Sequence, residues 1–131
     1  MVMQAGLVYP KHQFKPEDTL TFVHMRPFER AWDELGLSMV ELHELEVAIM
    51  AAPTGAPVMP GTRGLRKMRF SPKRWHTGKR GGMRACYVYL EEHHQVLLAL
   101  VYPKTQKDDL TAQDKKRINR VIESIERELD R

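Results

Sequence analysis

A dense group of basic residues in the middle of the chain is the feature most able to do chemistry. Residues 63–84 contain nine Lys or Arg, and no Asp or Glu occurs between Glu46 and Glu91. Removing these nine from the 21 basic residues leaves 12 against all 17 acidic ones, so the rest of the chain has a net charge of −5. Such a positive segment attracts polyanions and releases their counterions. The segment therefore predicts a surface that binds a phosphate-rich polymer, of which nucleic acid is the commonest.

Several of these cations, with a tyrosine and a lysine further along the chain, have the residue types that RNA cleavage without a metal ion requires. The 2′-hydroxyl of RNA can attack the adjacent phosphate when a base takes its proton, cations neutralise the phosphoryl oxygens and an acid protonates the leaving 5′-oxygen. Like-charged neighbours lower the pKa of a lysine, which makes a clustered lysine a candidate base, and the planar guanidinium group of arginine matches two phosphate oxygens. The candidates are Lys67, Arg69, Lys79, Arg80, Arg84, Tyr102 and Lys104. In the alternative interpretation, the same cations only grip the RNA backbone.

Other catalytic arrangements find little support in the sequence. His93 and His94 are adjacent, so on a strand they point to opposite faces and do not easily chelate one metal ion. The glycines of residues 61–64 lack the length and the Lys-Ser/Thr ending of a nucleotide-binding loop. None of the three serines lies in the strand-to-helix turn of a serine nucleophile. We therefore expect neither a metal ion nor a cofactor.

Alternation of apolar and polar residues predicts the strands that hold these cations. The expected strands cover residues 19–25, 65–70, 83–90 and 95–102. On the second of them, Lys67 and Arg69 share a face because they are two residues apart. We expect Arg84 to point to solvent near the end of the third strand. We expect Cys86, the only cysteine, to be a packed strand residue, which fits a chain without an internal disulfide.

Capping residues predict the helices. Pro27 and Gly36 bracket a first helix, and Ser38 with Glu41 forms a capping box that opens a second helix antiparallel to the first. Thr111 caps a long last helix. Its apolar stripe must dock on the sheet or on a partner, and comprises Ile118, Val121, Ile122, Ile125 and Leu129.

The predicted elements give an α+β fold: a small, largely antiparallel sheet flanked by an N-terminal helical pair and a C-terminal helix. Residues 1–18 show no periodicity and are expected to be an irregular leader, followed by a single domain over residues 19–131. The chain has no apolar run long enough to span a membrane and no secretory signal pattern near its start, so we expect a soluble cytoplasmic protein.

Three runs of sequence together resemble the RelE/HigB superfamily of type II toxin-antitoxin toxins. They are residues 61–70 (GTRGLRKMRF), 78–84 (GKRGGMR) and 101–111 (VYPKTQKDDLT). Upstream, residues 31–32, 35–37 and 42–46 are similar to the helical pair of the HigB-like branch. The resemblance extends over residues 22–127. It implies a RelE-like α+β ribonuclease that enters the ribosomal A site, cuts mRNA there and is held inactive by a cognate antitoxin.

The resemblance also implies roles for individual cations. Lys67, Arg69, Arg84 and Lys104 match the family's catalytic positions: Lys67 or Lys104 as the proton acceptor, Arg84 as the phosphate clamp and a candidate acid, and Arg69 as charge support. Residues expected to hold RNA backbone or to stack on a base are Arg63, Arg66, Arg74, Trp75, Lys79, Arg80, Tyr102 and Lys107. The expected partners are the ribosome, mRNA and an antitoxin that is a small helix-turn-helix protein, with operator DNA bound only through the antitoxin complex.

Two alternatives and one departure from the family pattern accompany this interpretation. The protein could be a non-catalytic binder of RNA or the ribosome, or a regulatory protein whose cationic face only seats an acidic antitoxin segment. Several relatives complete the site with a Tyr or His near the C-terminus, whereas this chain runs from Lys107 through Asp108 and Asp109 into a helix. Tyr102 can substitute only if its side chain turns toward the cations, and otherwise it is a core or rim aromatic.

Overall fold

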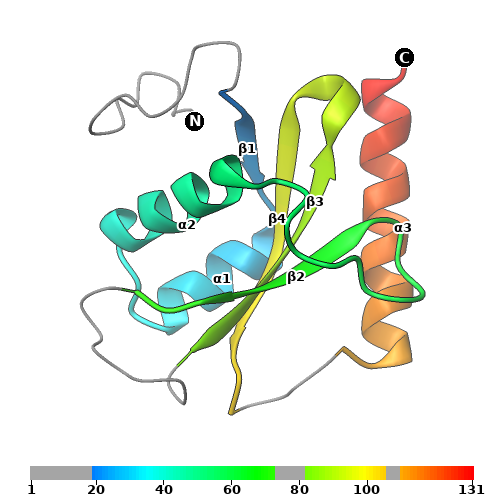
Figure 1. The fold of residues 1–131 in the computed structure, drawn as a ribbon. Coiled ribbons are helices and arrows are strands. Elements are labelled where there is room, and N and C mark those ends of the chain that lie inside the picture. Colours follow the sequence, from blue (N-terminus) through cyan, green and yellow to red (C-terminus); the bar gives the residue numbers. More distant parts are fainter. Residues whose placement is uncertain (1–18, 73–81, 106–109) are drawn as a thin grey trace.

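Four strands with alternating apolar residues form the centre of the protein (Figure 1). The structure is a computed structural model that describes residues 19–72, 82–105 and 110–131. The strand order is β1-β4-β3-β2. The strands are β1 (Thr21–His24), β2 (Leu65–Phe70), β3 (Met83–Leu90) and β4 (Gln95–Pro103). The bounds predicted for β2 and β3 are confirmed, and the chain has the predicted α+β architecture.

The sheet is largely antiparallel, as predicted from the sequence, and has one parallel pair. β2 pairs with β3, and β3 with β4, in antiparallel register, but β1 pairs with β4 in parallel, with Thr21 opposite Gln95 and His24 opposite Leu98. The sheet is therefore mixed. A parallel pair needs a long crossover, and the two N-terminal helices with the β2–β3 ribbon supply it between β1 and β4.

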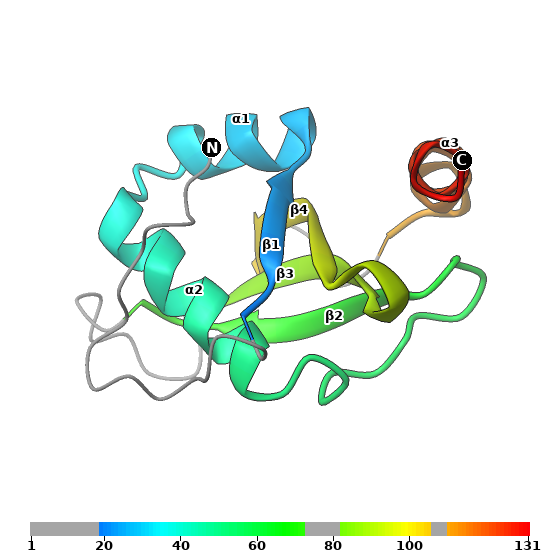
Figure 2. The same ribbon diagram turned by 90° about the horizontal axis from the view of Figure 1, so that it is seen from above.

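The three helices begin where the sequence predicts. They are α1 (Arg26–Glu34), α2 (Met39–Ala51) and α3 (Ala112–Leu129). The Ser38 capping box of α2 is formed, and Thr111 and Asp114 cap the start of α3 reciprocally, with both bonds 3.0 Å long. Gly36 adopts a φ of 72° in the turn after α1, which a residue with a Cβ rarely tolerates. Figure 2 shows α1 and α2 diverging from this turn, so the two helices are splayed rather than closely antiparallel.

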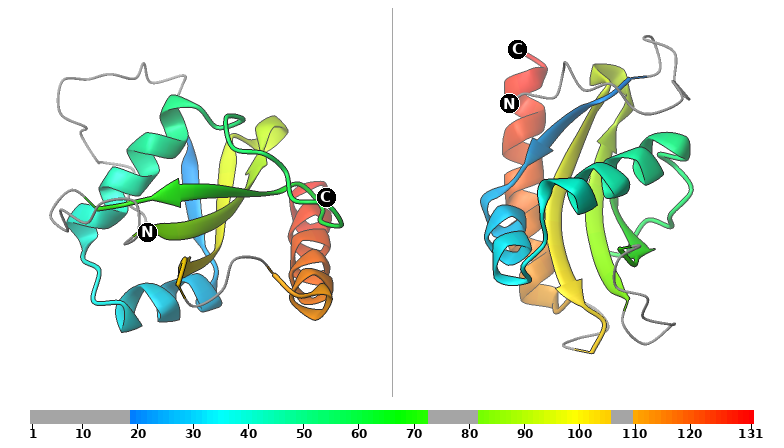
Figure 3. Two further views of the ribbon diagram at one scale, coloured as in Figure 1. Left: turned by 60° about the horizontal axis from the view of Figure 1, so that its bottom comes forward. Right: turned by 90° about the vertical axis from the view of Figure 1, so that its left-hand side faces the viewer.

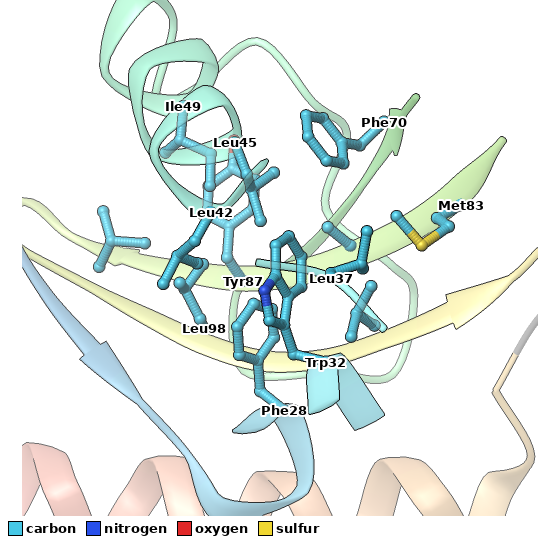
Figure 4. Close-up of a cluster of buried hydrophobic side chains, with 13 residues drawn as sticks. Phe28, Trp32, Leu37, Leu42, Leu45, Ile49, Phe70, Met83, Tyr87 and Leu98 are labelled. Atoms are coloured by element: carbon cyan, nitrogen blue, oxygen red, sulfur yellow. The ribbon is translucent and has the colours of Figure 1, made fainter. Parts of the chain in front are cut away.

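The sheet separates two apolar cores. On one face, α1 and α2 pack through Phe28, Trp32, Leu45 and Ile49 (Figure 4). Trp32 is buried as predicted, stacks on Phe28 with ring centroids 5.3 Å apart, and donates its indole N–H to the carbonyl of Ser38 at 3.2 Å. The opposite face carries α3, so the sheet lies between the helical pair and the last helix (Figure 3).

Helix α3 docks on the sheet through only part of its predicted stripe. Ile118 and Ile122 are buried against Leu65, Cys86, Val88 and Leu97, which also confirms that Cys86 is a packed strand residue. Ile125 and Leu129 pack partly against this cluster. Val121 is 39% exposed, so its inclusion in the buried stripe was wrong: at about 3.6 residues per turn it lies beside the contact with the sheet.

Some predictions fall on residues outside the described part of the chain. The leader expected over residues 1–18 is one of these, and residues 73–81 and 106–109 are the others. Among the helices that are described, none combines the length and apolar character needed to cross a membrane.

Candidate functional site

The pairing of β2 with β3 places three of the predicted catalytic residues on one face of the sheet. Lys67 lies opposite Cys86, and Arg69 lies opposite Arg84. Directly opposed residues of an antiparallel pair point to the same side, and residues two apart along one strand share a face. Lys67, Arg69 and Arg84 are therefore neighbours on the face that also carries α3. We refer to this set of three residues as the cationic face.

Arg84 is more enclosed than the sequence suggested. It is 8% exposed, which corrects the expectation of a strand-end cation pointing to solvent. The reason is its place on the central strand β3, between Arg69 on β2 and Tyr102 on β4. Within residues 19–72, 82–105 and 110–131, no hydrogen bond or ion pair to its guanidinium group is present. The fully buried side-chain atoms that lack a hydrogen-bond partner in the described residues do not include its nitrogens, and Arg84 lines a cavity, so its charge is not sealed in the core.

Tyr102 and Lys104 lie at the same end of the sheet. Tyr102 is opposite Arg84 and is 4% exposed, in the same apolar cluster as Cys86 and Leu110. It is thus a core aromatic that contacts the edge of the cationic face. Lys104 is exposed in the turn after β4, and its backbone N–H donates to the carbonyl of Gly82 at 3.2 Å. This bond holds the lysine beside the start of β3, two residues before Arg84.

A cavity of about 820 Å³ runs along the outer margin of β2. Lys67, Arg69 and Arg84 border it, together with Ala48 of α2, Ala52 just after α2 and the loop before β2. Met68 and Tyr87 also line it, and these two side chains belong to the α2 face of the sheet. The cavity therefore borders both faces of the sheet at the edge strand β2, and it does not coincide with the cationic face. Its volume lies within the range of about 300–1,000 Å³ that is usual for ligand pockets.

Two cations predicted to hold RNA have hydrogen-bond partners within the protein, and their role toward RNA stays a prediction. Arg66 points to the α2 side, where its guanidinium group donates to the carbonyls of Thr54 and Ala56 at 3.1 and 2.6 Å. Arg63 binds Glu126 of α3 at 2.9 Å, and this hydrogen bond with the charge of Glu126 raises the pKa of Arg63 above its usual value. Neither side chain belongs to the cationic face. Glu123 of α3 also lies 3.9 Å from Arg63.

The remaining predicted RNA contacts lie outside the described residues. They are Arg74, Trp75, Lys79, Arg80 and Lys107. Their proposed roles stay predictions.

Sequence reasoning did not anticipate a polar pair on the α2 side. His24 of β1 and the buried Glu46 of α2 lie 3.2 Å apart, between Nε2 and Oε2. No motif joins two residues so far apart in the sequence, and only the packing of α2 over β1 brings them together. Among the described residues, no group of three or more His, Cys, Asp or Glu side chains is placed to hold a metal ion.

The arrangement of helices and strands is shared with a known toxin. No family model matches the sequence. A mutant of the Escherichia coli toxin RelE, solved in the free state, aligns with a TM-score of 0.52 over 76% of this chain and 96% of that one. The fold is that of RelE. The two sequences are only 14% identical, so the comparison concerns the fold and not the activity.

Two further structures from E. coli give weaker alignments. The intact RelBE toxin-antitoxin complex is 16% identical, with a TM-score of 0.48 over 65% of this chain and 96% of that one. The isolated RelE toxin is 16% identical, with a TM-score of 0.47 over 79% of this chain and 99% of that one. Assignment to the HigB-like branch stays a prediction.

Proposed function

We propose that this protein is the toxin of a type II toxin-antitoxin system and that it cleaves mRNA on the ribosome. The observation that carries the proposal is the opposition of Arg69 and Arg84 on adjacent strands of a RelE fold, with Lys67 on the same face. A set of cations on one face can neutralise the charge that grows on a phosphate during cleavage. The sequence runs that resemble RelE and HigB proteins contain these same residues.

The proposed reaction is an attack of an RNA 2′-hydroxyl on its neighbouring phosphate. Lys67 or Lys104 takes the proton of the 2′-hydroxyl, and Arg84 holds the phosphoryl oxygens while Arg69 adds positive charge. The bond from phosphorus to the 5′-oxygen breaks, and that oxygen receives a proton from an acid in the site. The products are a 2′,3′-cyclic phosphate on one fragment and a 5′-hydroxyl on the other.

The proposed partners follow from the same resemblance. A cognate antitoxin, a small helix-turn-helix protein, is expected to hold the toxin inactive and to bring it to operator DNA. RelE, which has this fold, is found in a toxin-antitoxin complex. The neighbouring open reading frame is the first place to look for such a protein.

Translating ribosomes provide the direct test of this function. The protein is added to a cell-free translation reaction and new mRNA 5′ ends are mapped, with naked mRNA as the control. Cuts that appear only in ribosome-bound mRNA support the proposal. Arrest of translation without cuts would instead assign a non-catalytic binder.

The burial of Arg84 is the observation that favours this second candidate. A guanidinium group in a residue that is only 8% exposed presents little surface to RNA unless the site opens. A protein that arrests ribosomes by occupying RNA would need only the exposed cations, such as Arg69 and Lys104.

A further inference from the structure

The solvent side of α3 carries three cations that the cationic face does not include. Lys116, Arg117 and Arg120 are exposed, whereas Ile118 and Ile122 of the same helix are buried. At about 3.6 residues per turn, the three cations lie on the side of the helix opposite the two isoleucines. We refer to these three cations as the α3 basic row.

The acidic residues of α3 do not neutralise this row. Glu126 binds Arg63 at 2.9 Å, on the flank of the helix next to the loop before β2. Glu123 lies 3.1 Å from Arg127 and 3.9 Å from Arg63. In the described part of the chain, no salt bridge involves a residue of the α3 basic row. The described carboxylates of the helix therefore leave the charge of the row facing solvent.

Helix stability does not explain the position of these cations. Residues 112–120 contain four basic residues and one acidic residue, whereas residues 121–129 contain one basic and three acidic residues. The helix macrodipole favours the reverse order, with acidic side chains near the N-terminus and basic ones near the C-terminus. An external anion that binds the N-terminal half of α3 would account for the observed order.

The helix that carries the α3 basic row lies on the same side of the sheet as the cationic face. Lys67, Arg69 and Arg84 point to the side of the sheet on which α3 lies. Figures 1 and 3 show the N-terminal half of α3 at the same end of the molecule as the end of β4, where Tyr102 and Lys104 follow Arg84 across the sheet. The two groups of cations can therefore contact one extended polyanion.

We propose that the α3 basic row binds the phosphate backbone of folded RNA, separately from the strand that enters the cationic face. A convex row of cations on a helix suits the rows of phosphates on the outside of a double-helical segment, and it makes no contact that depends on base identity. The row holds a structured RNA, and the cationic face takes a single strand beside it. This inference goes beyond the proposed cleavage, because the binding requires no scissile phosphate.

A matched pair of double variants tests the row. The test variant is Lys116→Gln with Arg120→Gln, two exposed cations four residues apart on α3. The control is Arg26→Gln with Arg30→Gln, two exposed cations at the same spacing on α1, across the sheet from α3. Both remove two charges, and glutamine keeps a helix propensity close to that of Lys and Arg. Binding of the full chain to an RNA duplex of about 20 base pairs is measured over a range of salt concentrations.

The expected result is weaker duplex binding by the α3 variant, with the slope of log affinity against log salt reduced by about 2. The α1 variant should keep the slope of the unmodified protein. Equal losses in both variants would overturn the proposal, because net charge alone would then explain them. Unchanged duplex binding by the α3 variant would overturn the proposal too, even if that variant lost the binding of a protein partner. Cleavage is not measured, so these outcomes are independent of the proposed reaction.

Discussion

Arg69 on β2 lies directly opposite Arg84 on β3, and both side chains point to the face of the sheet that carries α3. Like charges at directly opposed positions destabilise an antiparallel pair. Lys67 on the same face adds a third positive charge. An anion bound at this face would relieve the repulsion. The repulsion between these two arginines destabilises the folded protein, and a bound phosphate would reduce that destabilisation.

The first prediction concerns the role of Arg84 in catalysis. Arg84→Gln should reduce ribosome-dependent mRNA cleavage by 10²- to 10³-fold, about 3 kcal/mol of transition-state stabilisation, because glutamine cannot neutralise the charge on the phosphoryl oxygens. Cleavage is quantified by primer extension across a cut site. Arg30→Gln, on the other side of the sheet, serves as the control. Undiminished cutting by Arg84→Gln would remove Arg84 from the mechanism.

The second prediction concerns the docking of α3. Ile122 is fully buried between α3 and the sheet, so Ile122→Ala should lower the free energy of unfolding by about 2–5 kcal/mol. Val121→Ala removes a neighbouring side chain that is 39% exposed and should cost less than about 1 kcal/mol. Urea denaturation followed by circular dichroism gives both values. Similar losses in the two variants would contradict the observed orientation of α3, in which Ile122 faces the sheet and Val121 lies beside the contact.

The third prediction concerns the pH dependence of stability. Burial raises the pKa of Tyr87 above its ordinary value of 10.0, and its hydroxyl donates to the carbonyl of Pro53 at 2.8 Å. Above pH 10 the unfolded chain loses the tyrosine proton first, so the folded state binds more protons and the free energy of unfolding falls as pH rises.

Tyr87→Phe isolates this contribution because phenylalanine has no proton to lose. Stability of both proteins is measured by urea denaturation between pH 8 and about 11, the range that spans the ordinary tyrosine pKa. The unmodified protein should lose stability more steeply above pH 10 than the variant does. Parallel pH profiles would show that Tyr87 does not titrate differently in the folded and unfolded states.

The sequence predicted those parts of the fold that depend on local pattern. The alternation of residues 65–70 and 83–90 located β2 and β3, and the capping residues Ser38 and Thr111 located the starts of α2 and α3. Such signals depend on neighbours a few residues apart, because a strand alternates every second residue and a cap bonds within one turn.

Features set by distant pairing could not be predicted in this way. The pattern of residues 19–25 indicates a strand but not that it runs parallel to β4. The burial of Arg84 follows from the two strands beside it, and the contact of His24 with Glu46 follows from the packing of α2 over β1. The neutralisation of Arg63 by Glu126 depends on where α3 docks. Each of these contacts joins residues far apart in the sequence, so the periodicity of a helix or a strand does not predict it.

The chemical identity of the new RNA ends tests the central claim most directly. Ribosome-bound mRNA is cut with the protein, and the fragments are treated with polynucleotide kinase and labelled ATP, with or without prior phosphatase. Attack by the 2′-hydroxyl predicts 5′-hydroxyl ends, which label without phosphatase, and 2′,3′-cyclic phosphates on the upstream fragments. Downstream fragments with 5′-phosphates would contradict the mechanism assigned to Lys67, Arg69 and Arg84.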